Sequence, residues 1–556
     1  MLDDIKKWQD NLDDASKLEL SKLNEDELYD AFYKDISFGT GGMRGIIGVG
    51  TNRINIYTLR SANYGFFKFM QSRYNRKLSV VIAYDNRHKS ADFALDSALT
   101  LASLGVKVYL FNKITPTPEL SFAVRYYKAT GGIVITASHN PPKYNGYKIY
   151  DDKGCQLVPD LANIVIDNIK TAPSPFSLKL KPLKEYEELG LIETTDDKVD
   201  EEYLKNVKSI SVNNVKKDDF KIVFSPLHGT SAYLGPRLLK EMGYNYVTVK
   251  EQMIADSNFS TVKLPNPEDK NAFDLSIALA KKENADICIA TDPDADRVGL
   301  AVKDKDEYVL LTGNQTGALL INYLVHYRNT TKKGVLFNTI VTSPLGSIIA
   351  SDYNIRTFST LTGFKFIGEQ AGLLEDSEEE EFYFGYEESY GYVVKDFVRD
   401  KDSLQALLLC SEMACFYKNQ GMSLIEVLES IYQKYGYYME DLINIVHDGA
   451  SGEKIINRIM TYFRGVNDFN NPKLKVVSKE DYKLSEKKNY KDNSVSKLLL
   501  PKSDVLKFYL DDGSWFVFRP SGTEPKIKVY ISVHKNTRID SLNRIKEIKD
   551  ELMKLV

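Results

Sequence analysis

Short β-rich runs alternate with longer segments of helical period along most of the chain, and this alternation constrains the fold more than any other feature. The runs are LSVVIAY, VKVYLFN, GGIVITA, FKIVFSP, YVTVK, ADICIATD, GVLFNTI and FYFGYEE. The stretches between them, such as SADFALDSALTLASLG, have the apolar spacing typical of helices. Strand–helix alternation predicts the α/β class, in which parallel or mixed sheets are covered by helices.

The alternation recurs in three rounds, and a chain of 556 residues is too long for one core. Before the rounds, residues 1–34 are predicted to form an amphipathic helix. After them, VLKFYL, the turn DDG and SWFVFRP predict an antiparallel hairpin, and KIKVYISV predicts a third strand. We therefore expect three α/β domains over residues 1–205, 206–305 and 306–440 and a smaller α+β domain over 441–556. Within the last, the polar segment 483–497 is expected to be a loop.

The overall composition argues against several classes of partner. Lys and Arg total 73 against 77 Asp and Glu, so the net charge of −4 does not favour nucleic acid. The N-terminus has no signal-peptide pattern, and no apolar run approaches the roughly 18 residues that cross a bilayer. The four cysteines are scattered without a CxxC pair, which is typical of reduced, buried thiols. We expect a cytoplasmic protein that binds neither nucleic acid nor membranes.

Three aspartates alternate in TDPDADR, directly after the apolar run ICIA: Asp292, Asp294 and Asp296. In α/β folds, sites lie at the carboxyl ends of strands, where this triplet is expected. Their oxygens suit Mg²⁺ or a similar divalent ion, and carboxylates this close repel each other unless a cation neutralises them. An EF-hand is excluded, because Arg297 and Lys303 stand where Gly and Glu are needed. We predict a catalytic metal site, with a charged surface turn as the alternative.

A nucleophile candidate lies in TASHNPPKYNGYKIY, residues 136–150. Ser138 and His139 are adjacent in the loop that follows GGIVI, and Lys148 comes ten residues later. Serine beside histidine suggests hydrolysis, but adjacent residues on a chain rarely face each other. The chemistry of Ser138 therefore depends on side chains from elsewhere in the sequence.

An anion site is predicted in FRPSGTEPK, residues 518–526, which leaves a β-strand and crosses a tight loop. Arg519 supplies the bidentate fork that phosphate geometry favours. Ser521, Thr523 and the backbone N–H groups around Gly522 can complete a concave site. An ordinary polar turn is the alternative.

Two further stretches carry weaker signals. In GYEESYG, residues 385–391, Glu387 and Ser389 can hydrogen-bond sugar hydroxyls, although from these residues alone surface structure is the default interpretation. In VRDKDS, residues 398–403, Lys401 can meet a phosphate or move a proton, and a solvated charge run is the alternative.

The glycine-rich stretch FGTGGMRG, residues 38–45, is neither a P-loop nor a dinucleotide fingerprint. Its glycines allow a close approach to a ligand, toward which Arg44 would aim a positive charge. Together, a metal cage, a distant anion clamp, one nucleophile candidate and nearby cations point to phosphoryl transfer.

Taken in their order, these stretches resemble the α-D-phosphohexomutase superfamily, which includes phosphoglucomutases and phosphomannomutases, over nearly the whole chain. TASHNP resembles the loop whose serine is phosphorylated, and DPDADR resembles the magnesium loop. GYEESYG resembles the sugar-binding loop, and RPSGTEPKIKVY resembles the phosphate-binding loop. The resemblance implies four domains around a deep central cleft, three of them similar α/β units.

The match looks closest to the long phosphoglucomutase group that also contains phosphopentomutases. FGTGGMRG and TLTGFKFIG, residues 360–368, support that choice. Lys528 stands where the family usually has arginine, which keeps the charge but loses the fork. The sugar loop ends in Gly391 and Tyr392 and lacks the histidine of the shorter mannose and glucose enzymes, which puts mannose specificity in question.

The resemblance implies an intramolecular phosphotransferase that interconverts glucose 1-phosphate and glucose 6-phosphate, or mannose phosphates, through a phosphoserine and a bisphosphate intermediate. Mg²⁺ would be held by Ser138, Asp292, Asp294 and Asp296. The implied catalytic residues are Arg44, Ser138, His139, Lys148 and Lys401. The implied substrate-binding residues are Arg297, Lys365, Glu387, Ser389, Arg519, Ser521, Gly522 and Thr523. A hexose 1,6-bisphosphate is the expected activator.

Several alternatives stay open at this point. A phosphopentomutase would act on ribose or deoxyribose phosphates, a phosphosugar phosphatase would release phosphate to water, and a binding protein would do no chemistry. The acid/base is open among Lys148, Arg44 and Lys401, with His139 expected mainly to orient its loop. A lysine in that role needs a lowered pKa to act near neutral pH.

Overall fold

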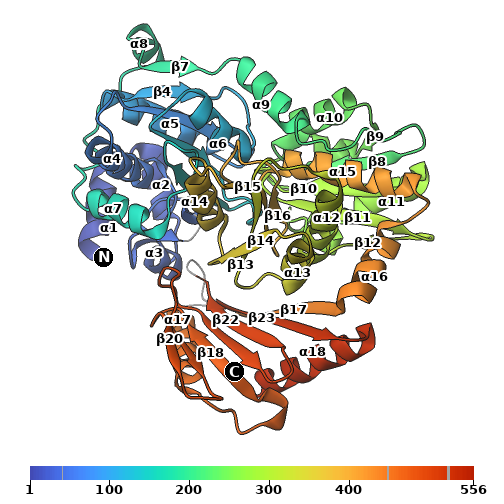
Figure 1. Ribbon diagram of the computed structural model, residues 1–556. Helices are drawn as coiled ribbons and strands as arrows, with labels where there is room; N and C mark the ends of the chain where they lie inside the picture. Colours follow the sequence, from blue (N-terminus) through green and yellow to red (C-terminus); the bar gives the residue numbers. More distant parts are fainter. Residues whose placement is uncertain (40–41, 447–449, 522–525, 556) are drawn as a thin grey trace. The chain divides into compact units, whose positions relative to one another are not determined.

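The structure is a computed structural model that describes residues 1–39, 42–446, 450–521 and 526–555. These residues form two compact units (elements labelled in Figure 1). Unit 1 comprises residues 1–316, 327–334 and 363–423, and unit 2 comprises residues 317–326, 335–362 and 424–556. The predicted domain boundaries at 205, 305 and 440 stay predictions. Among the helices described, none is both long and apolar enough to span a membrane.

The chain begins with three short helices, so the single helix predicted over residues 1–34 is wrong. They are α1 (Leu2–Asn11), α2 (Asp14–Ser21) and α3 (Glu25–Phe32). Asp13 and Asn24 cap the second and third helices through their side chains, which explains why the helical pattern restarts there. Trp8 is buried and packs edge-on against Phe32, as the apolar pattern predicted, whereas Leu18 is exposed.

The first sheet of unit 1 has seven strands in the order β1-β2-β6-β5-β3-β4-β7. β5, β3, β4 and β7 are parallel, whereas β6, β2 and β1 join antiparallel, so the sheet is mixed. β3, β4 and β5 confirm three predicted strands. The strands are β1 (Phe38–Gly39), β2 (Gly42–Ile46), β3 (Ser79–Tyr84), β4 (Lys107–Leu110), β5 (Gly131–Ile135), β6 (Tyr144–Tyr150) and β7 (Ile192–Thr194). The helices are α4 (Ile56–Arg73), α5 (Ser90–Ser103), α6 (Thr117–Tyr126), α7 (Pro159–Ile169) and α8 (Leu183–Glu188).

The second sheet of unit 1 has the order β12-β11-β10-β8-β9. β10, β8 and β9 are parallel, and β11 and β12 complete the sheet antiparallel. The strands are β8 (Lys221–Ser225), β9 (Asn245–Thr248), β10 (Ile287–Thr291), β11 (Val298–Asp304) and β12 (Glu307–Leu310). The helices are α9 (Lys198–Lys208), α10 (Ser231–Glu241), η1 (Lys250–Met253), η2 (Lys270–Phe273) and α11 (Asp274–Glu283).

Residues 313–435 contribute strands to both units. β13 (Lys333–Thr339) and β14 (Arg356–Thr360) pair in parallel. β15 (Glu380–Glu387) and β16 (Gly391–Val393) form an antiparallel hairpin in unit 1. The helices are α12 (Gly313–Tyr327), α13 (Pro344–Asp352), α14 (Phe364–Leu374), α15 (Ser403–Asn419) and α16 (Leu424–Tyr435).

The C-terminal part of unit 2 is an antiparallel sheet in the order β17-β23-β22-β21-β18-β19-β20, with α18 packed along β17 and β23 (Figure 1). The predicted hairpin and third strand are confirmed as β21, β22 and β23. The prediction of a loop over 483–497 is wrong, because β19 pairs with β18 and β20 pairs in turn with β19. The elements are β17 (Tyr437–Val446), α17 (Ala450–Gly465), η3 (Pro472–Leu474), β18 (Val476–Asp481), β19 (Glu486–Asn489), β20 (Val495–Lys497), β21 (Leu506–Leu510), β22 (Trp515–Pro520), β23 (Lys526–Lys535) and α18 (Arg538–Met553).

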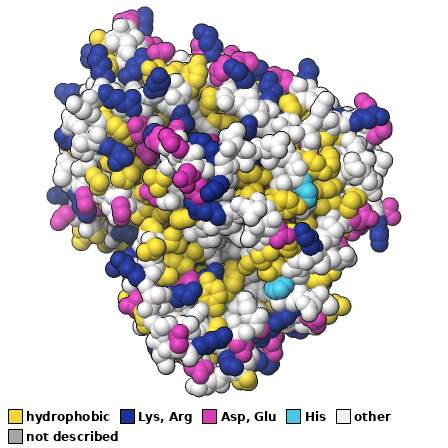
Figure 2. Space-filling view, viewed as in Figure 1, with side chains coloured by type: hydrophobic (Ala, Val, Ile, Leu, Met, Phe, Trp, Pro, Cys, Tyr) yellow, Lys and Arg dark blue, Asp and Glu magenta, His cyan; other side chains and the backbone are white. Residues whose placement is uncertain are grey.

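Two surface and core features agree with the composition. All four cysteines are buried and free, as predicted. On the face drawn in Figure 2, cationic and anionic side chains are interspersed and form no basic stripe of the kind that follows nucleic acid.

Candidate active site

Ser138 occupies a strained turn at the carboxyl end of β5. Its φ is +53°, in the left-handed region that a serine enters at a cost on the order of 1–3 kcal/mol. The turn is fixed locally because the backbone N–H of Ser138 donates to Thr136 Oγ1 at 2.8 Å. The Ser138 side chain is almost completely buried. A buried hydroxyl on a strained turn at the end of a strand is placed where α/β folds carry their functional groups, which fits the predicted role of Ser138 as a nucleophile.

The hydroxyl of Ser138 faces the aspartate triplet. Ser138 Oγ donates to Asp292 Oδ2 at 2.8 Å, although the two residues are far apart in sequence. His139 Nδ1 lies 3.0 Å from the same Oγ, so these adjacent side chains do face each other. The left-handed turn at Ser138 makes this possible, because it departs from the extended backbone that sends successive side chains to opposite sides.

Asp292, Asp294 and Asp296 follow β10 directly and are buried, with one carboxylate oxygen from each lying within 4.8 Å of the others. Asp292 Oδ1 accepts from the backbone N–H groups of Asp296 and Arg297, at 3.0 and 2.9 Å. Asp294 Oδ1 and Asp296 Oδ1 are buried and accept no hydrogen bond. Unsatisfied carboxylate oxygens that converge in this way fit a divalent cation, so the residues suit the predicted magnesium site.

Two lysines contact the same carboxylates. Lys148, on β6, places Nζ 2.8 Å from Asp294 Oδ2 and 3.3 Å from Asp296 Oδ2. Lys401 places Nζ 3.2 Å from Asp296 Oδ2 and equally far from Asp400 Oδ1. Burial lowers the pKa of each lysine, but the facing carboxylates outweigh it and raise the pKa overall. Lys148 therefore lacks the lowered pKa expected of a general base, and its charged form can only donate a proton.

Two arginines are attached to the loops of this cluster. Arg44 projects from β2, which pairs with β6, and its Nη1 donates to Asn140 Oδ1 at 3.1 Å. Arg297 ends the aspartate loop and forms an ion pair with Glu268 through Nη1. Both cations are thus attached to the loops that carry Ser138 and the triplet.

The predicted sugar loop joins β15 to β16. Glu387 is buried and accepts from the backbone N–H of Gly363 at 2.7 Å. Burial raises the pKa of Glu387 to about 7, against the opposing effect of Lys401. Ser389 is half-buried in the same loop. At Gly391, two residues later, a Cβ would lie 2.2 Å from Lys401 Cδ, so any larger residue there would displace the Lys401 side chain.

Lys365 lies in the first turn of α14 and is buried. It belongs, like Gly363, to the TLTGFKFIG stretch, so this stretch meets the sugar loop at Glu387. Ser138, His139, Lys148, Arg44, Arg297, Lys401, Glu387, Ser389, Lys365 and the three aspartates all belong to unit 1.

The predicted anion loop belongs to unit 2. Arg519 is the penultimate residue of β22, and its Nη1 donates to the Tyr530 hydroxyl at 3.3 Å. The backbone N–H of Ser521 donates to Lys526 O at 2.8 Å. Gly522 and Thr523 lie outside the described residues. The anion clamp therefore stays a prediction.

Sequence reasoning missed two residues that support the site. Thr117, at the start of α6, donates to Asp294 twice: its N–H to the carbonyl at 2.8 Å and its Oγ1 to Oδ2 at 3.0 Å. Arg87, in the loop after β3, donates to the carbonyl of Ser138. The signal for Arg87 was the Asp85-x-Arg87 pattern directly after a buried strand, where a charged pair is unusual.

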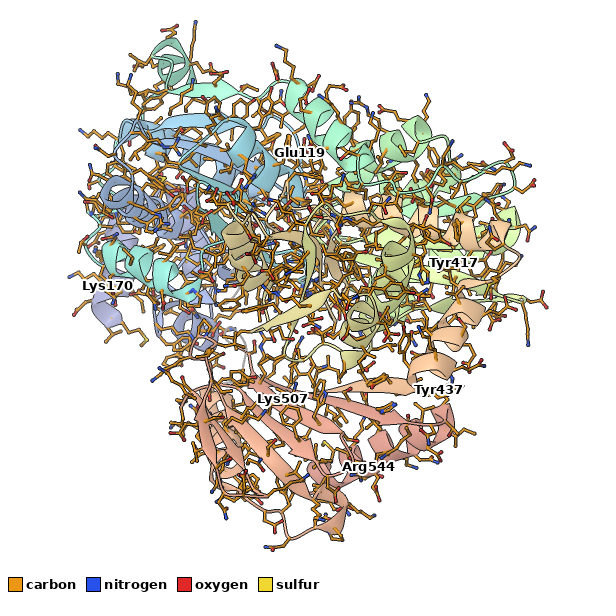
Figure 3. All side chains as sticks on the ribbon, in the orientation of Figure 1. Glu119, Lys170, Tyr417, Tyr437, Lys507 and Arg544 are labelled. Atoms are coloured by element: carbon orange, nitrogen blue, oxygen red, sulfur yellow. The ribbon has the colours of Figure 1, made fainter. Side chains whose placement is uncertain are left out.

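A cluster of buried carboxyl groups lies apart from the residues described above. Glu119, labelled in Figure 3, is on α6 and is 1% exposed. Burial raises the pKa of Glu119 well above its ordinary value, and the facing carboxylate of Asp200 raises it further. Lys113, which pairs with Asp200, partly offsets this rise, and Asp402, the N-cap residue of α15, adds to it. Tyr203 also faces this cluster and donates to Asp402 Oδ1 at 2.8 Å.

We expect Glu119→Gln to stabilise the protein more at pH 8.5 than at pH 5.5. The native state keeps a proton on Glu119 where the unfolded chain has lost it, so wild-type stability falls as pH rises above the ordinary pKa of 4.5. Glutamine preserves the donor to Asp200 and removes that loss. Thermal melts should show the Tm advantage growing by about 2 °C or more between the two pH values. The exposed Glu187→Gln is the control, and a pH-independent advantage would contradict the prediction.

Comparison with family models gives four matches that cover most of the chain. Each is described as phosphoglucomutase/phosphomannomutase: alpha/beta/alpha domain I matches residues 35–175, domain II residues 201–305, domain III residues 312–435, and the C-terminal domain residues 473–551.

Curated relatives are similar along nearly their whole length. A phosphoglucomutase of Staphylococcus epidermidis is 39% identical over 529 residues, which cover 95% of this chain and 96% of that protein. A phosphoglucomutase of Staphylococcus aureus is 38% identical over 509 residues, covering 91% of each.

Solved structures share the fold. A phosphoglucomutase/phosphomannomutase family protein from Burkholderia thailandensis has a TM-score of 0.67 and 18% identity, covering 94% of this chain and 98% of that one. Parafusin, a phosphoglucomutase from Paramecium in an open form, has the same TM-score and identity and covers 94% and 96%.

Proposed function

The chain belongs to the phosphoglucomutase/phosphomannomutase family, and from this premise we infer that it is a phosphosugar mutase of the isomerase class. We propose that it interconverts glucose 1-phosphate and glucose 6-phosphate. One observation carries the proposal: the Ser138 hydroxyl lies 2.8 Å from Asp292, inside a buried triplet of aspartates with unsatisfied oxygens. That pairing of a hydroxyl with a metal-binding cluster suits phosphoryl transfer.

In the proposed cycle, Ser138 rests as a phosphoserine. The 6-hydroxyl of glucose 1-phosphate takes the phosphoryl group: the hydroxyl gives up its proton as the new P–O bond forms, the bond from phosphorus to Ser138 Oγ breaks, and Ser138 Oγ takes up a proton, which leaves glucose 1,6-bisphosphate. After the bisphosphate reorients, its 1-phosphoryl group is transferred to Ser138 Oγ. Glucose 6-phosphate leaves, and the enzyme is again phosphorylated. Added hexose 1,6-bisphosphate would act as an activator because it rephosphorylates a serine that has lost its group.

Asp292, Asp294, Asp296 and phosphorylated Ser138 would hold Mg²⁺. When bound, Mg²⁺ supplies a Lewis acid that draws negative charge from the phosphoryl oxygens. Thr117 supports this set, because its two hydrogen bonds fix the orientation of Asp294.

The cations around the triplet would stabilise the charge of the transferring group. Arg44 and Arg297 offer planar forks suited to phosphoryl oxygens. Lys148 and Lys401 are buried and form ion pairs with Asp296, so their cationic forms would add to the positive charge around the transferring group. We assign Lys148 as the donor to Ser138 Oγ when the phosphoryl group leaves, with Arg44 and Lys401 as the alternatives. His139, 3.0 Å from that oxygen, would orient the hydroxyl.

Two predicted loops would supply the remaining substrate contacts. In unit 1, Glu387, Ser389 and Lys365 would hydrogen-bond the sugar hydroxyls. In unit 2, Arg519, Ser521, Gly522 and Thr523 would hold the phosphate that is not reacting. Lys528 pairs with Arg519 across β22 and β23, so this clamp has a second cation nearby. The four buried, reduced thiols favour the cytoplasm as the compartment of this reaction.

The test is an assay of products with Mg²⁺ and a trace of glucose 1,6-bisphosphate. We expect glucose 1-phosphate to yield glucose 6-phosphate with little inorganic phosphate. Dominant phosphate release would show a phosphatase instead, and neither product would indicate a binding protein. Values of kcat/KM for glucose 1-phosphate, mannose 1-phosphate and ribose 1-phosphate then rank the sugars. We expect glucose to lead; a lead for ribose would make the enzyme a phosphopentomutase.

A further inference from the structure

A single guanidinium group holds the backbone of the nucleophile and of the residues that follow it. Arg87 Nη2 donates to the carbonyls of Ser138 and Asn140, both at 2.5 Å. Its Nη1 donates to the carbonyls of Pro141 and Tyr144, at 3.0 and 3.1 Å. The Arg87 side chain is 0% exposed. Four acceptors from one short loop thus converge on one buried cation, which is far more than a turn needs for its own closure.

Arg87 is itself held rigidly. Asp85 Oδ2 lies 3.3 Å from Arg87 Nε, while Asp85 Oδ1 accepts from the Arg87 N–H at 2.9 Å and from Ser90 Oγ at 2.6 Å. The Phe259 ring covers the guanidinium at 4.9 Å. A planar fork whose two terminal nitrogens are both hydrogen-bonded, and whose face is covered by a ring, has little freedom to move.

Phe259 belongs to the segment that follows β9, so Arg87 also joins the two sheets of unit 1. Three neighbouring contacts reinforce the junction. Asn86 Nδ2 donates to Asp256 O at 3.1 Å, and Ser257 Oγ donates to Asn86 O at 2.7 Å. His88 Nε2 lies 2.8 Å from Asn258 Oδ1. The loop of Ser138 is therefore tied to the same half of the unit that carries the aspartate triplet.

We propose that Arg87 is a positioning residue for phosphoryl transfer, which holds the Ser138 turn in its left-handed conformation and so aims Oγ at the triplet. The proposal rests on the proposed function of Ser138 as phosphate carrier. It follows from the geometry, because the strained φ of +53° persists only where the surroundings fix it. On the backbone of Ser138 itself, the carbonyl accepts from Arg87 and the N–H donates to Thr136 Oγ1.

Three variants test the proposal. Arg87→Lys should keep the fold, because it keeps a positive charge beside Asp85. It should lose the positioning contacts, because one nitrogen cannot reach four carbonyls. Arg87→Met combined with Asp85→Asn removes the fork without leaving a buried unpaired carboxylate. Arg87→Ala leaves a guanidinium-shaped space. We expect kcat for glucose 1-phosphate to fall about 100-fold, as for a nucleophile misplaced by about 1 Å, with KM changed less than about threefold.

Arg328 is the matched control. Its guanidinium donates to the carbonyls of Phe382, Tyr383 and Val394, but it lies outside the candidate site. Arg328→Met should lower Tm while kcat stays within about twofold, since it removes comparable hydrogen bonds at a distance. In the Arg87→Ala variant, millimolar guanidinium should restore part of kcat, whereas sodium and methylammonium should not.

The outcomes separate this proposal from the proposed function. Intact mass after treatment with glucose 1,6-bisphosphate reports whether Ser138 of the wild type becomes phosphorylated; if it does not, the carrier role fails. If it does, unchanged kcat in Arg87→Lys would overturn the positioning role. Equal losses of kcat in the Arg328→Met control, or a loss that appears only in KM, would also overturn it. A selective fall in kcat with guanidinium rescue supports it.

Discussion

Replacing Ser138 with alanine should lower kcat for glucose 1-phosphate by about 10⁴-fold or more, because a methyl group cannot store the phosphoryl group and no second path replaces a covalent carrier. The fold should survive. Ser138 Oγ donates one hydrogen bond, to Asp292, and losing one costs about 1 kcal/mol. Steady-state assays and thermal melts measure both expectations.

Ser121→Ala is the matched control for this variant. Ser121 Oγ is equally buried and donates to the carbonyl of Gly154 at 2.6 Å, outside the site. It should lose comparable stability and keep its kcat. If Ser138→Ala kept more than about 1% of wild-type turnover, a nucleophile other than Ser138 would be required.

Replacing Asp292 with asparagine should have the second-largest effect, a fall in kcat of about 100- to 1,000-fold. Asparagine keeps the shape and one acceptor oxygen for the N–H groups of Asp296 and Arg297. It removes the charge that would bind Mg²⁺ and face the phosphoserine. Because it also removes one of three mutually repelling carboxylates, the variant should melt no lower than wild type in a chelator.

The same account predicts that a chelator abolishes wild-type activity and that added Mg²⁺ restores it. Asp286→Asn is the control, since Asp286 lies at the opposite end of β10 and accepts from the backbone of Lys221. It should retain wild-type kcat and the wild-type dependence on Mg²⁺. Full activity of Asp292→Asn, or of the chelated wild type, would contradict a metal role for the triplet.

The strand ends could be predicted from sequence because burial leaves a plain pattern there. GGIVI and ICIA are continuous apolar runs, and the polar residues that follow them mark where each strand leaves the core. Ser138 and the aspartate triplet were predicted in this way, and the structure brings them into contact. The strand β6, which carries Lys148, was missed because YNGYKIY mixes glycine, asparagine and lysine with its aromatic residues.

Other features depend on contacts that no local pattern specifies. The Asp85-x-Arg87 pattern marks a charged pair after a buried strand, but it does not show that Arg87 donates to carbonyls of a loop more than fifty residues away, because carbonyls are present in any sequence. The pKa of Lys148 is raised because Asp294 and Asp296, which follow a strand of another sheet, lie beside it. The direction of this pKa shift therefore depends on the folded unit and could not be predicted from the local sequence. The N-terminal helices were merged into one because caps such as Asp13 and Asn24 interrupt the chain without disturbing its apolar spacing.

The position of Arg519 and Ser521 relative to Ser138 is likewise a matter of tertiary assembly rather than of local sequence. In the proposed cycle the enzyme must keep one phosphate while the other reacts, and Arg519 is the predicted contact to the phosphate that is kept. Arg519→Ala should therefore raise KM more than it lowers kcat, since it weakens a contact made equally in the ground state and the transition state.

The most direct test follows a labelled phosphoryl group through one turnover. Wild-type enzyme is phosphorylated with ³²P-labelled glucose 1,6-bisphosphate, freed of excess label, and mixed with unlabelled glucose 1-phosphate. The account predicts that the label leaves Ser138 and appears in glucose 1,6-bisphosphate and glucose 6-phosphate. Label that stays on the protein during turnover, or that appears as inorganic phosphate, would contradict it.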